Sequence, residues 1–452
     1  MKKGNDWHDL ITINFLIIML ICVWGLSGLF IRLNLRLVSL LTTGIVIITW
    51  LAIYRTTGRN LWSFTVIYLS VFILFHFGLI IVFLTPYDYQ NQMMSFVQQW
   101  FDGPYLIQAI IASILGLIAC AIGMIIGKRV SPQGGSNDHA YIKRLRFSKA
   151  GFCLMLIGAG GWFVLSIHYG AAGILIGAYG DYLTQVEGGV MAYCFALLGI
   201  GAVLLGAGES SDWQKLGFGV FIIFSIVAIP IGIRGQVLFP ATSMMAVMAK
   251  RRNFITQKQT LVLAGAVLCL IALVGQLRVG GIKNFSRGTM TAKPLDAVAE
   301  MGGSIYPVVL VVRAHEEGNP YLYGTSYWAP AERLILKMIP DAKRLPADQD
   351  QRLSNVWVFK NYGPYGFSPI AEGYRNGGFI GVIIALLLIG FMIGLIEAWP
   401  NHPNLQLLSG IIFMPLFIQI RNAFTPVLTQ LIVGLLVGLF VIKVGPIKVD
   451  KY

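Results

Sequence analysis

Apolar runs long enough to cross a membrane dominate this sequence. A soluble domain carries about 25% charged residues, whereas only 12% of the 452 residues here are charged. At 1.5 Å per residue, about 20 helical residues cross a hydrocarbon core of about 30 Å. The clearest runs are Ile11–Ile31, Leu61–Leu84, Tyr105–Gly127, Thr260–Gln276 and Gly377–Trp399. The chain is therefore predicted to be an all-α integral membrane protein.

The pattern as a whole predicts twelve transmembrane helices around one large polar insert. The predicted spans are 11–31, 36–54, 61–84, 105–127, 149–168, 189–208, 216–233, 236–250, 260–278, 377–399, 404–420 and 425–442. Spans one to nine fill residues 1–278, and spans ten to twelve fill residues 377–452. Between them, 279–376 is predicted to be an extracytoplasmic loop that contains short helices. A membrane-embedded chain that keeps such a loop is expected to use it.

Basic residues set the predicted orientation. Lysine and arginine cluster in 128–149, which is assigned to the cytoplasm, whereas the outer segments 85–104 and 169–188 contain neither. By the positive-inside rule, both termini are cytoplasmic. Arg32 and Arg36, in a short outer turn, go against the pattern. Long loops translocate largely regardless of charge, so the insert is placed outside.

Two apolar stretches are predicted to be tight hairpins with an arginine at the apex. Leu216–Met248 would be roughly 50 Å long as one helix, which is too long for a single span without severe tilt. Its centre contains Pro230 and Arg234. Asn404–Ile442 has the same form, with Arg421 near its middle. By parity, both apices open to the side of the insert.

Arginines near the outer ends of spans are candidates for binding a diphosphate. Arginine stays charged and offers phosphate oxygens a forked set of donors. Fixed cations also stabilise the charge that develops on a leaving diphosphate. The candidates are Arg234, Arg421, Arg278, Arg287 and Arg375. The alternative is that each one only extends to the membrane surface from a helix end.

Aromatic residues are dense in the insert, especially in its last part. Aromatic faces stack on sugar rings, and phenol or indole groups hydrogen-bond at the edge. The candidate glycan-binding residues are Trp357, Tyr362, Tyr365 and Tyr374. The alternative is an aromatic belt that anchors the loop to lipid headgroups. The segment Ala331–Ile339, between Pro330 and Pro340, is expected to form a helix that lies along the membrane surface.

Glycosyl transfer requires a base that removes a proton from the acceptor hydroxyl. Glu372 and His315 are the catalytic candidates, with Glu300 and Asp102 as further carboxylates on the outer side. Glu372 stands close to Arg375 in sequence, so the two could instead form a structural salt bridge. His315 lies in a charged stretch that also reads as ordinary solvated chain.

Several site classes are not indicated by the sequence. No carboxylate cluster or histidine spacing suggests a metal site, and no cofactor is expected. The five cysteines lie inside apolar runs without metal-binding or disulfide spacing. The net charge of +14 does not imply nucleic acid, because basic residues near spans set topology or meet anionic lipid.

The layout and three local motifs resemble the Wzy-type polymerases of bacterial surface polysaccharides, which include O-antigen polymerases. The motifs are Arg234-Gly235-Gln236 in a hairpin, the run from Ser368 to Tyr374, and Gly377-Gly378 at the next span. The resemblance implies transfer of an undecaprenyl-diphosphate-linked glycan onto a new lipid-linked unit outside a bacterial inner membrane. It also implies the bilayer, a chain-length regulator and a flippase as partners. The paired arginine loop motifs described for some members are not clear here, which leaves the base and sugar contacts open.

Three other functions stay open at this point. A ligase of similar architecture would share the donor chemistry. A flippase or other transporter usually places ionisable residues at mid-membrane, and the predicted span interiors contain almost none. A non-enzymatic scaffold would use the insert as a protein-binding surface. Substitution of Arg234 and Arg421 separates the scaffold from an enzyme, because only an enzyme should lose turnover.

Overall fold

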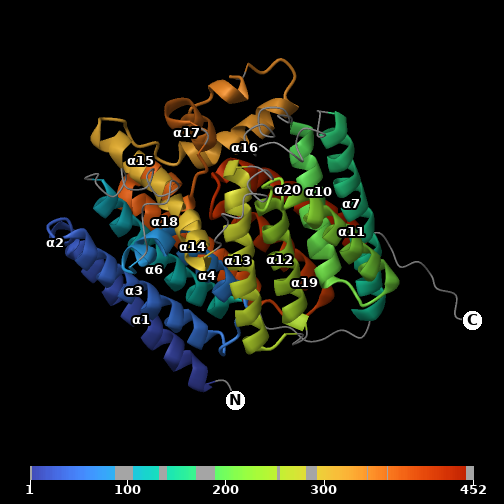
Figure 1. The fold of residues 1–452 in the computed structure, drawn as a ribbon, viewed down its shortest axis with the longest axis horizontal. Helices are drawn as coiled ribbons and strands as arrows, with labels where there is room; N and C mark the ends of the chain where they lie inside the picture. Colours follow the sequence, from blue (N-terminus) through green and yellow to red (C-terminus); the bar gives the residue numbers. More distant parts are fainter. Residues whose placement is uncertain are drawn as a thin grey trace, which may run out of the picture. The chain divides into compact units, whose positions relative to one another are not determined.

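The computed structural model (Figure 1) describes residues 3–86, 105–131, 140–168, 189–251, 255–280, 293–343, 345–363 and 365–443. Arg287, one of the candidate arginines, lies outside these ranges. Every regular element within them is a helix. Ten helical segments there are long and apolar enough to cross a membrane. The prediction of an all-α, multi-pass membrane protein is confirmed.

Nine of the ten candidate spans coincide with predicted spans, and the tenth does not. The remaining three predicted spans form helices of 17 residues each, which are shorter than the candidate spans. These are α11 (Asp212–Ala228), α12 (Gly235–Arg251) and α19 (Pro403–Gln419). The tenth candidate span, Pro294–Glu316, lies within the insert, where the sequence predicted only short helices. The insert therefore contains an apolar helical segment of membrane-spanning length.

The chain divides into two compact units, each described by itself. The first unit comprises 1–131, 298–398 and 415–429, and the second comprises 132–297, 399–414 and 430–452. The first unit contains α1 (Lys3–Gly25), α2 (Ser27–Phe30), α3 (Leu35–Thr56), α4 (Phe64–Phe83), α6 (Leu106–Val130), η2 (Gly303–Ile305), α15 (Tyr306–Glu316), α16 (Thr325–Met338), η3 (Ala347–Gln349), α17 (Ser354–Tyr362) and α18 (Pro369–Ala398). The second contains α7 (Ala140–His168), α10 (Gly189–Ala207), α11, α12 and α13 (Gln257–Gly280). The helices α14 (Pro294–Gly302), α19 and α20 (Phe424–Lys443) are divided between the units.

The helices α6 and α18 form the core of the first unit and pack closely. A Cβ atom at Gly116 would lie 3.1 Å from the Val382 side chain, and one at Gly127 would lie 2.8 Å from the Leu395 nitrogen. Such small residues let two helix backbones approach each other inside a membrane. Because both residue numbers rise together along this contact, the two helices run parallel. The start of α6 and the start of α18 thus lie at the same end of the unit.

The helix α4 runs in the opposite direction to α18. The Glu397 carboxylate, at the end of α18, accepts a hydrogen bond of 2.6 Å from the Phe64 backbone nitrogen, at the start of α4. An acidic side chain at a helix N-terminus satisfies an otherwise unpaired N–H group. The C-terminal end of α4 therefore lies where the insert joins α18.

The apolar segment α14–η2–α15 packs on that end of α4. A Cβ atom at Gly78 would lie 3.2 Å from the Val298 side chain and 3.4 Å from Gly302. Val298 and Gly302 are one helical turn apart, yet they meet the same position of α4. This face of α14 therefore packs directly on α4 at Gly78.

The surface helix predicted over Ala331–Ile339 starts earlier than expected. The helix α16 begins at Thr325 and contains Pro330 in its interior. The reason is a tertiary contact, because the Gly324 nitrogen, at the N-cap, donates a hydrogen bond of 2.8 Å to the Asn376 side chain. The C-terminal limit was predicted correctly, since α16 ends just before Pro340.

The predicted hairpin around Arg234 is present in the second unit. Gln214, near the start of α11, and Arg251, at the end of α12, both donate to the Gly208 carbonyl, at 3.5 Å and 2.8 Å. The two helices therefore return to the same place, and Arg234 lies in the turn at their other end. The helices α19 and α20 are likewise joined by a short turn that contains Arg421.

Candidate functional site

The residues just before the span predicted at 377–399 form a short buried helix, and the helix is broken after them. Residues 369–376 are buried, and the backbone leaves helical geometry at Gly377 and Gly378. Gly378 has a φ of 58°, in the left-handed region that favours glycine. A Cβ atom there would lie 2.8 Å from the Tyr321 hydroxyl. Glycine is therefore required at this break, which aims the short helix separately from the long apolar one.

Glu372 is the centre of a buried hydrogen-bond network. Its side chain is 0% exposed. One carboxylate oxygen accepts from the Ser326 hydroxyl at 3.0 Å and from the Ser354 hydroxyl at 3.1 Å, and the other accepts from the Phe424 nitrogen at 2.6 Å. These donors come from α16, α17 and the start of α20. Glu372 thus joins three separate chain segments to α18.

Asn376 completes this network on the side of α16. Its amide nitrogen donates to the Ser326 hydroxyl at 2.7 Å and to the Glu372 carbonyl at 2.8 Å. The nitrogens of Leu322 and Tyr323 donate to the carbonyls of residues 375 and 376, each at 3.0 Å. The chain before α16 therefore closes the C-terminal end of the short helix at the break.

Arg375 projects from the same helix into a different set of contacts. Its guanidinium lies over the Trp357 ring at 4.5 Å, which is cation–π geometry. It donates to the Gln351 carbonyl at 2.7 Å, to the Arg352 carbonyl at 3.3 Å and to the Ser354 hydroxyl at 3.2 Å. Among the described residues, these contacts use three of the five N–H donors of an arginine.

The predicted pair of Glu372 and Arg375 is joined through a hydroxyl. Within the described ranges, no ion pair directly connects the two side chains. Instead, the Ser354 hydroxyl accepts from Arg375 and donates to Glu372. The two charged groups are therefore coupled, while each keeps its own further partners.

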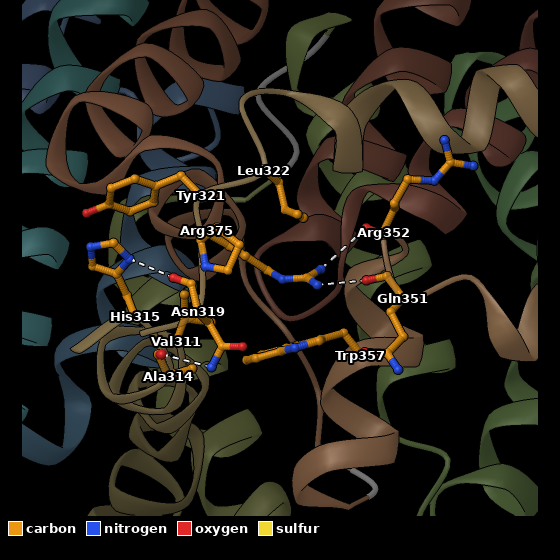
Figure 2. A pocket seen from close by; sticks show the side chains of 11 residues that line it. Val311, Ala314, His315, Asn319, Tyr321, Leu322, Gln351, Arg352, Trp357 and Arg375 are labelled. Carbon is orange, nitrogen blue, oxygen red and sulfur yellow. Dashed lines mark hydrogen bonds between the residues drawn. The ribbon is translucent and has the colours of Figure 1, made fainter. Parts of the chain in front are cut away.

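Arg375 and His315 line the same cavity, of about 230 Å³ (Figure 2). The lining residues are Val311, Ala314, His315, Asn319, Pro320, Tyr321, Leu322, Gln351, Arg352, Trp357 and Arg375. Figure 2 shows His315 and Tyr321 on one side, and Arg375 reaching toward Gln351 and Arg352 on the other. A cation, an imidazole, two aromatic rings and amide side chains thus meet around one space.

His315 is held in a defined orientation in this pocket. Its ring stacks on Tyr321, with centroids 3.8 Å apart and planes 22° apart. Its Nδ1 lies 3.0 Å from the Asn319 carbonyl oxygen. Because a carbonyl oxygen only accepts, Nδ1 carries the hydrogen, and in the neutral ring Nε2 is the atom that can take up a proton.

An ion-pair network supports the wall formed by Gln351 and Arg352. The Arg352 guanidinium bonds the Asp350 carboxylate at 2.9 Å and the Glu332 carboxylate at 2.7 Å. Arg333 lies 3.5 Å from Asp350. The hydrogen bond from Arg352 holds the pKa of the Asp350 carboxyl below its ordinary value, so the carboxylate stays charged. These contacts fix the two carbonyls that hold Arg375.

The four aromatic residues predicted to bind glycan lie in different surroundings. Trp357 lines the pocket, and Tyr362 packs against it with ring centroids 5.3 Å apart. Tyr374 is buried beside Tyr321 and His315. Tyr365 is half-exposed and packs on Tyr306. Trp357 is therefore the one of the four in the pocket lining, while Tyr321 is a lining ring that the sequence did not single out.

The remaining predicted arginines lie in three different places. Arg421, in the α19–α20 turn, is exposed beside the Phe75 ring, 5.9 Å from its centroid. Its backbone oxygen would lie 3.0 Å from a Cβ atom at Gly366, so this turn touches the end of the insert. Arg234 belongs to the second unit, where it is 7% exposed and donates to the Ile271 carbonyl of α13 at 3.3 Å. Arg278 lies in the last turns of α13.

Several residues of the pocket and its network were missed by the sequence reasoning. They are Asn319, Gln351, Arg352, Ser326 and Ser354. They come from three short segments, at Asn319, at Ser326 and at 351–354, and no spacing connects these segments. The only local signal was the Asp350-Gln351-Arg352 string, whose two charged ends form the ion pair.

Substitution of Glu372 by alanine is expected to destabilise the fold by about 3–5 kcal/mol, as when one partner of a buried charged contact is removed. Two hydroxyls and one backbone N–H group would lose their acceptor. Thermal unfolding of the purified protein measures this, with Glu316→Gln, at an exposed position, as the control. A variant as stable as the parent that makes no product would instead assign Glu372 to the chemistry.

Comparison with known proteins gives a family and one curated relative. The sequence pattern described as O-antigen polysaccharide polymerase Wzy matches residues 10–448. Protein CapE of Staphylococcus aureus is 23% identical over 254 residues, which cover 56% of this chain and 56% of CapE. The chain thus aligns with about half the length of that relative. No solved structure matches the chain.

Proposed function

The chain belongs to the O-antigen polysaccharide polymerase Wzy family, and from that membership we propose that it polymerises a bacterial surface polysaccharide. The substrate is an undecaprenyl-diphosphate-linked oligosaccharide, and the site faces the outside of the inner membrane, with both termini in the cytoplasm. The observation that carries the assignment of the site is that His315 and Arg375 line one pocket in the insert. A polymerase of this kind needs a base that deprotonates the acceptor hydroxyl and a cation beside the diphosphate that leaves.

The reaction is a glycosyl transfer between two lipid-linked molecules. A hydroxyl on the new repeat unit attacks the anomeric carbon of the growing chain. The bond from that carbon to the diphosphate breaks, and undecaprenyl diphosphate leaves with the electron pair. The proton of the attacking hydroxyl goes to a base. The glycan is thereby moved as a block onto the new unit.

His315 is the proposed base. The Asn319 carbonyl fixes its tautomer, so Nε2 can accept the proton. Glu372 is the weaker candidate, because three donors already occupy its carboxylate and it is not among the lining residues of the pocket. We assign Glu372 to holding Arg375 and α16 in place.

Arg375 is the proposed diphosphate contact in the pocket. Its stacking on Trp357 and its carbonyl contacts hold the guanidinium in one orientation, and a pre-oriented cation stabilises developing negative charge most effectively. Arg421, on the turn that touches the insert, is a second candidate. Arg234 and Arg278 belong to the second unit and Arg287 lies outside the described residues, so their proposed role as diphosphate ligands rests on their sequence positions alone. Trp357 and Tyr321, with Tyr362, Tyr365 and Tyr374 nearby, are proposed to contact the glycan.

A reconstituted reaction tests the proposal. Purified protein in lipid, supplied with lipid-linked repeat units alone, is expected to give a ladder of products separated by one repeat unit. Gel analysis of the released glycan measures this. A ligase would instead need a different acceptor and give no ladder, and a transporter would leave the units unchanged. The absence of a ladder, with units intact in a correctly folded preparation, would refute the polymerase proposal.

A further inference from the structure

The helix α16 carries an apolar stripe that no part of the described chain covers. Trp328, Ala331, Ile335 and Met338 recur at the spacing of one helix face. The side chains of Trp328, Ile335 and Met338 are 58%, 49% and 84% exposed. The other face of α16 is attached to the unit through Ser326, Ala329 and Pro330, which are buried. Large apolar side chains exposed along one face indicate an interaction surface.

The position of α16 relative to the membrane follows from its contacts with α18. The residues just before it bond to Asn376, at the break in α18. Beyond the break, α18 exposes Ile380, Ile384 and Leu388, each more than half exposed, on one face. Such a stripe on a span of this length faces lipid tails. Since the stripe begins four residues after Asn376, α16 starts at the boundary between the tails and the headgroups.

We propose that α16 is an interfacial helix whose Trp328–Met338 stripe is inserted into the outer face of the bilayer. The partner is a lipid surface, because the helix starts at the level where the lipid-facing stripe of α18 begins. Its composition agrees, since Trp328 and Tyr323 are aromatic residues of the type that anchor at headgroup level. Lys337, exposed near the helix end, would meet anionic headgroups.

This attachment goes beyond the proposed reaction, because it concerns how the site is held at the membrane. Ser326, in the first turn of α16, bonds directly to Glu372. Glu332 and Arg333, in its middle, belong to the ion-pair network beneath the wall that holds Arg375. A helix fixed in the interface would therefore hold the pocket at headgroup level.

Spin labels measure the depth of α16 without reference to activity. The full-length protein is placed in nanodiscs of phosphatidylethanolamine and phosphatidylglycerol, with a label at Met338→Cys. The matched controls are Leu388→Cys, on the lipid-facing stripe of α18, and Asp348→Cys, at an exposed polar position. The native cysteines are replaced in all three variants. They are Cys22, Cys120, Cys153, Cys194 and Cys269.

The label at Met338 is expected to be more accessible to oxygen than to a water-soluble nickel chelate, as at Leu388 and opposite to Asp348. A Met338 label that behaves like Asp348 would overturn the proposal. The same result is expected if a protein partner covers the stripe in the cell. The nanodisc contains no such partner, so the stripe would then face water. Failure of polymerase activity would leave this result unaffected.

A second measurement uses the chain with its native cysteines. Lipids with brominated tails quench tryptophans that reach them, and Trp328 is one of ten tryptophans in the chain. The fraction of the tryptophan emission that the brominated lipids quench is expected to be smaller in Trp328→Phe than in the parent protein. If the quenched part is the same in both proteins, Trp328 does not reach the tails, and the proposed insertion is wrong.

Discussion

His315→Gln is expected to lower the rate of chain elongation by about 100- to 10,000-fold, the range for loss of a general base. Glutamine has a similar reach and can still donate to the Asn319 carbonyl, but it cannot take up a proton. The measurement is the turnover number with saturating lipid-linked repeat units. Thermal unfolding should stay close to that of the parent protein, because His315 is only partly buried.

The matched control for this prediction is Glu316→Gln, which changes the adjacent exposed side chain. Its turnover should equal that of the parent protein. If His315→Gln elongates chains at the parental rate, the proton is removed by another group, and Glu372, Glu300 and Asp102 become the candidates to test.

Arg375→Ala is expected to lower turnover by about 100- to 1,000-fold, as for removal of a donor that stabilises developing charge. The loss also leaves the Gln351 and Arg352 carbonyls without their donor, so a lower unfolding temperature is expected with it. Arg375→Lys separates the two effects. Lysine keeps the charge but lacks the planar fork and the stacking on Trp357, so turnover should stay low while stability partly recovers.

Arg313→Ala is the control for the Arg375 variants. Arg313 is an arginine of the same unit, is about half exposed and pairs with Glu317 outside the pocket lining. Its removal should leave turnover unchanged. If Arg375→Lys works at the parental rate, the guanidinium of Arg375 has only a structural role, and Arg421 becomes the leading diphosphate contact.

Hydropathy and chain breakers were sufficient to predict most of the membrane helices. The turn at Arg234 could be predicted because one helix over Leu216–Met248 would be too long for a membrane, and Pro230 marked where it breaks. The short helices predicted in the insert are present at Pro294–Glu316, where α14, η2 and α15 together are long and apolar enough to cross a membrane.

The site was only partly predictable, for a physical reason. Glu372 and Arg375 were found because they stand together in one polar run before a span. Ser326, Ser354 and the Phe424 nitrogen reach Glu372 from three other segments. Neither helical nor strand periodicity links positions so far apart. The hydroxyl that joins Glu372 to Arg375, in place of a direct salt bridge, could not be read from their spacing.

The break at Gly377 and Gly378 divides α18 into the short helix that carries Glu372 and Arg375 and a long apolar part. A long span adapts to a thinner or thicker bilayer by tilting, and glycine torsions change at low cost. The two parts still pack on each other, because a Cβ atom at Gly373 would lie 2.8 Å from the Val382 Cα atom. A change in the tilt of the apolar part is therefore expected to reach the helix that carries Glu372 and Arg375 through this contact.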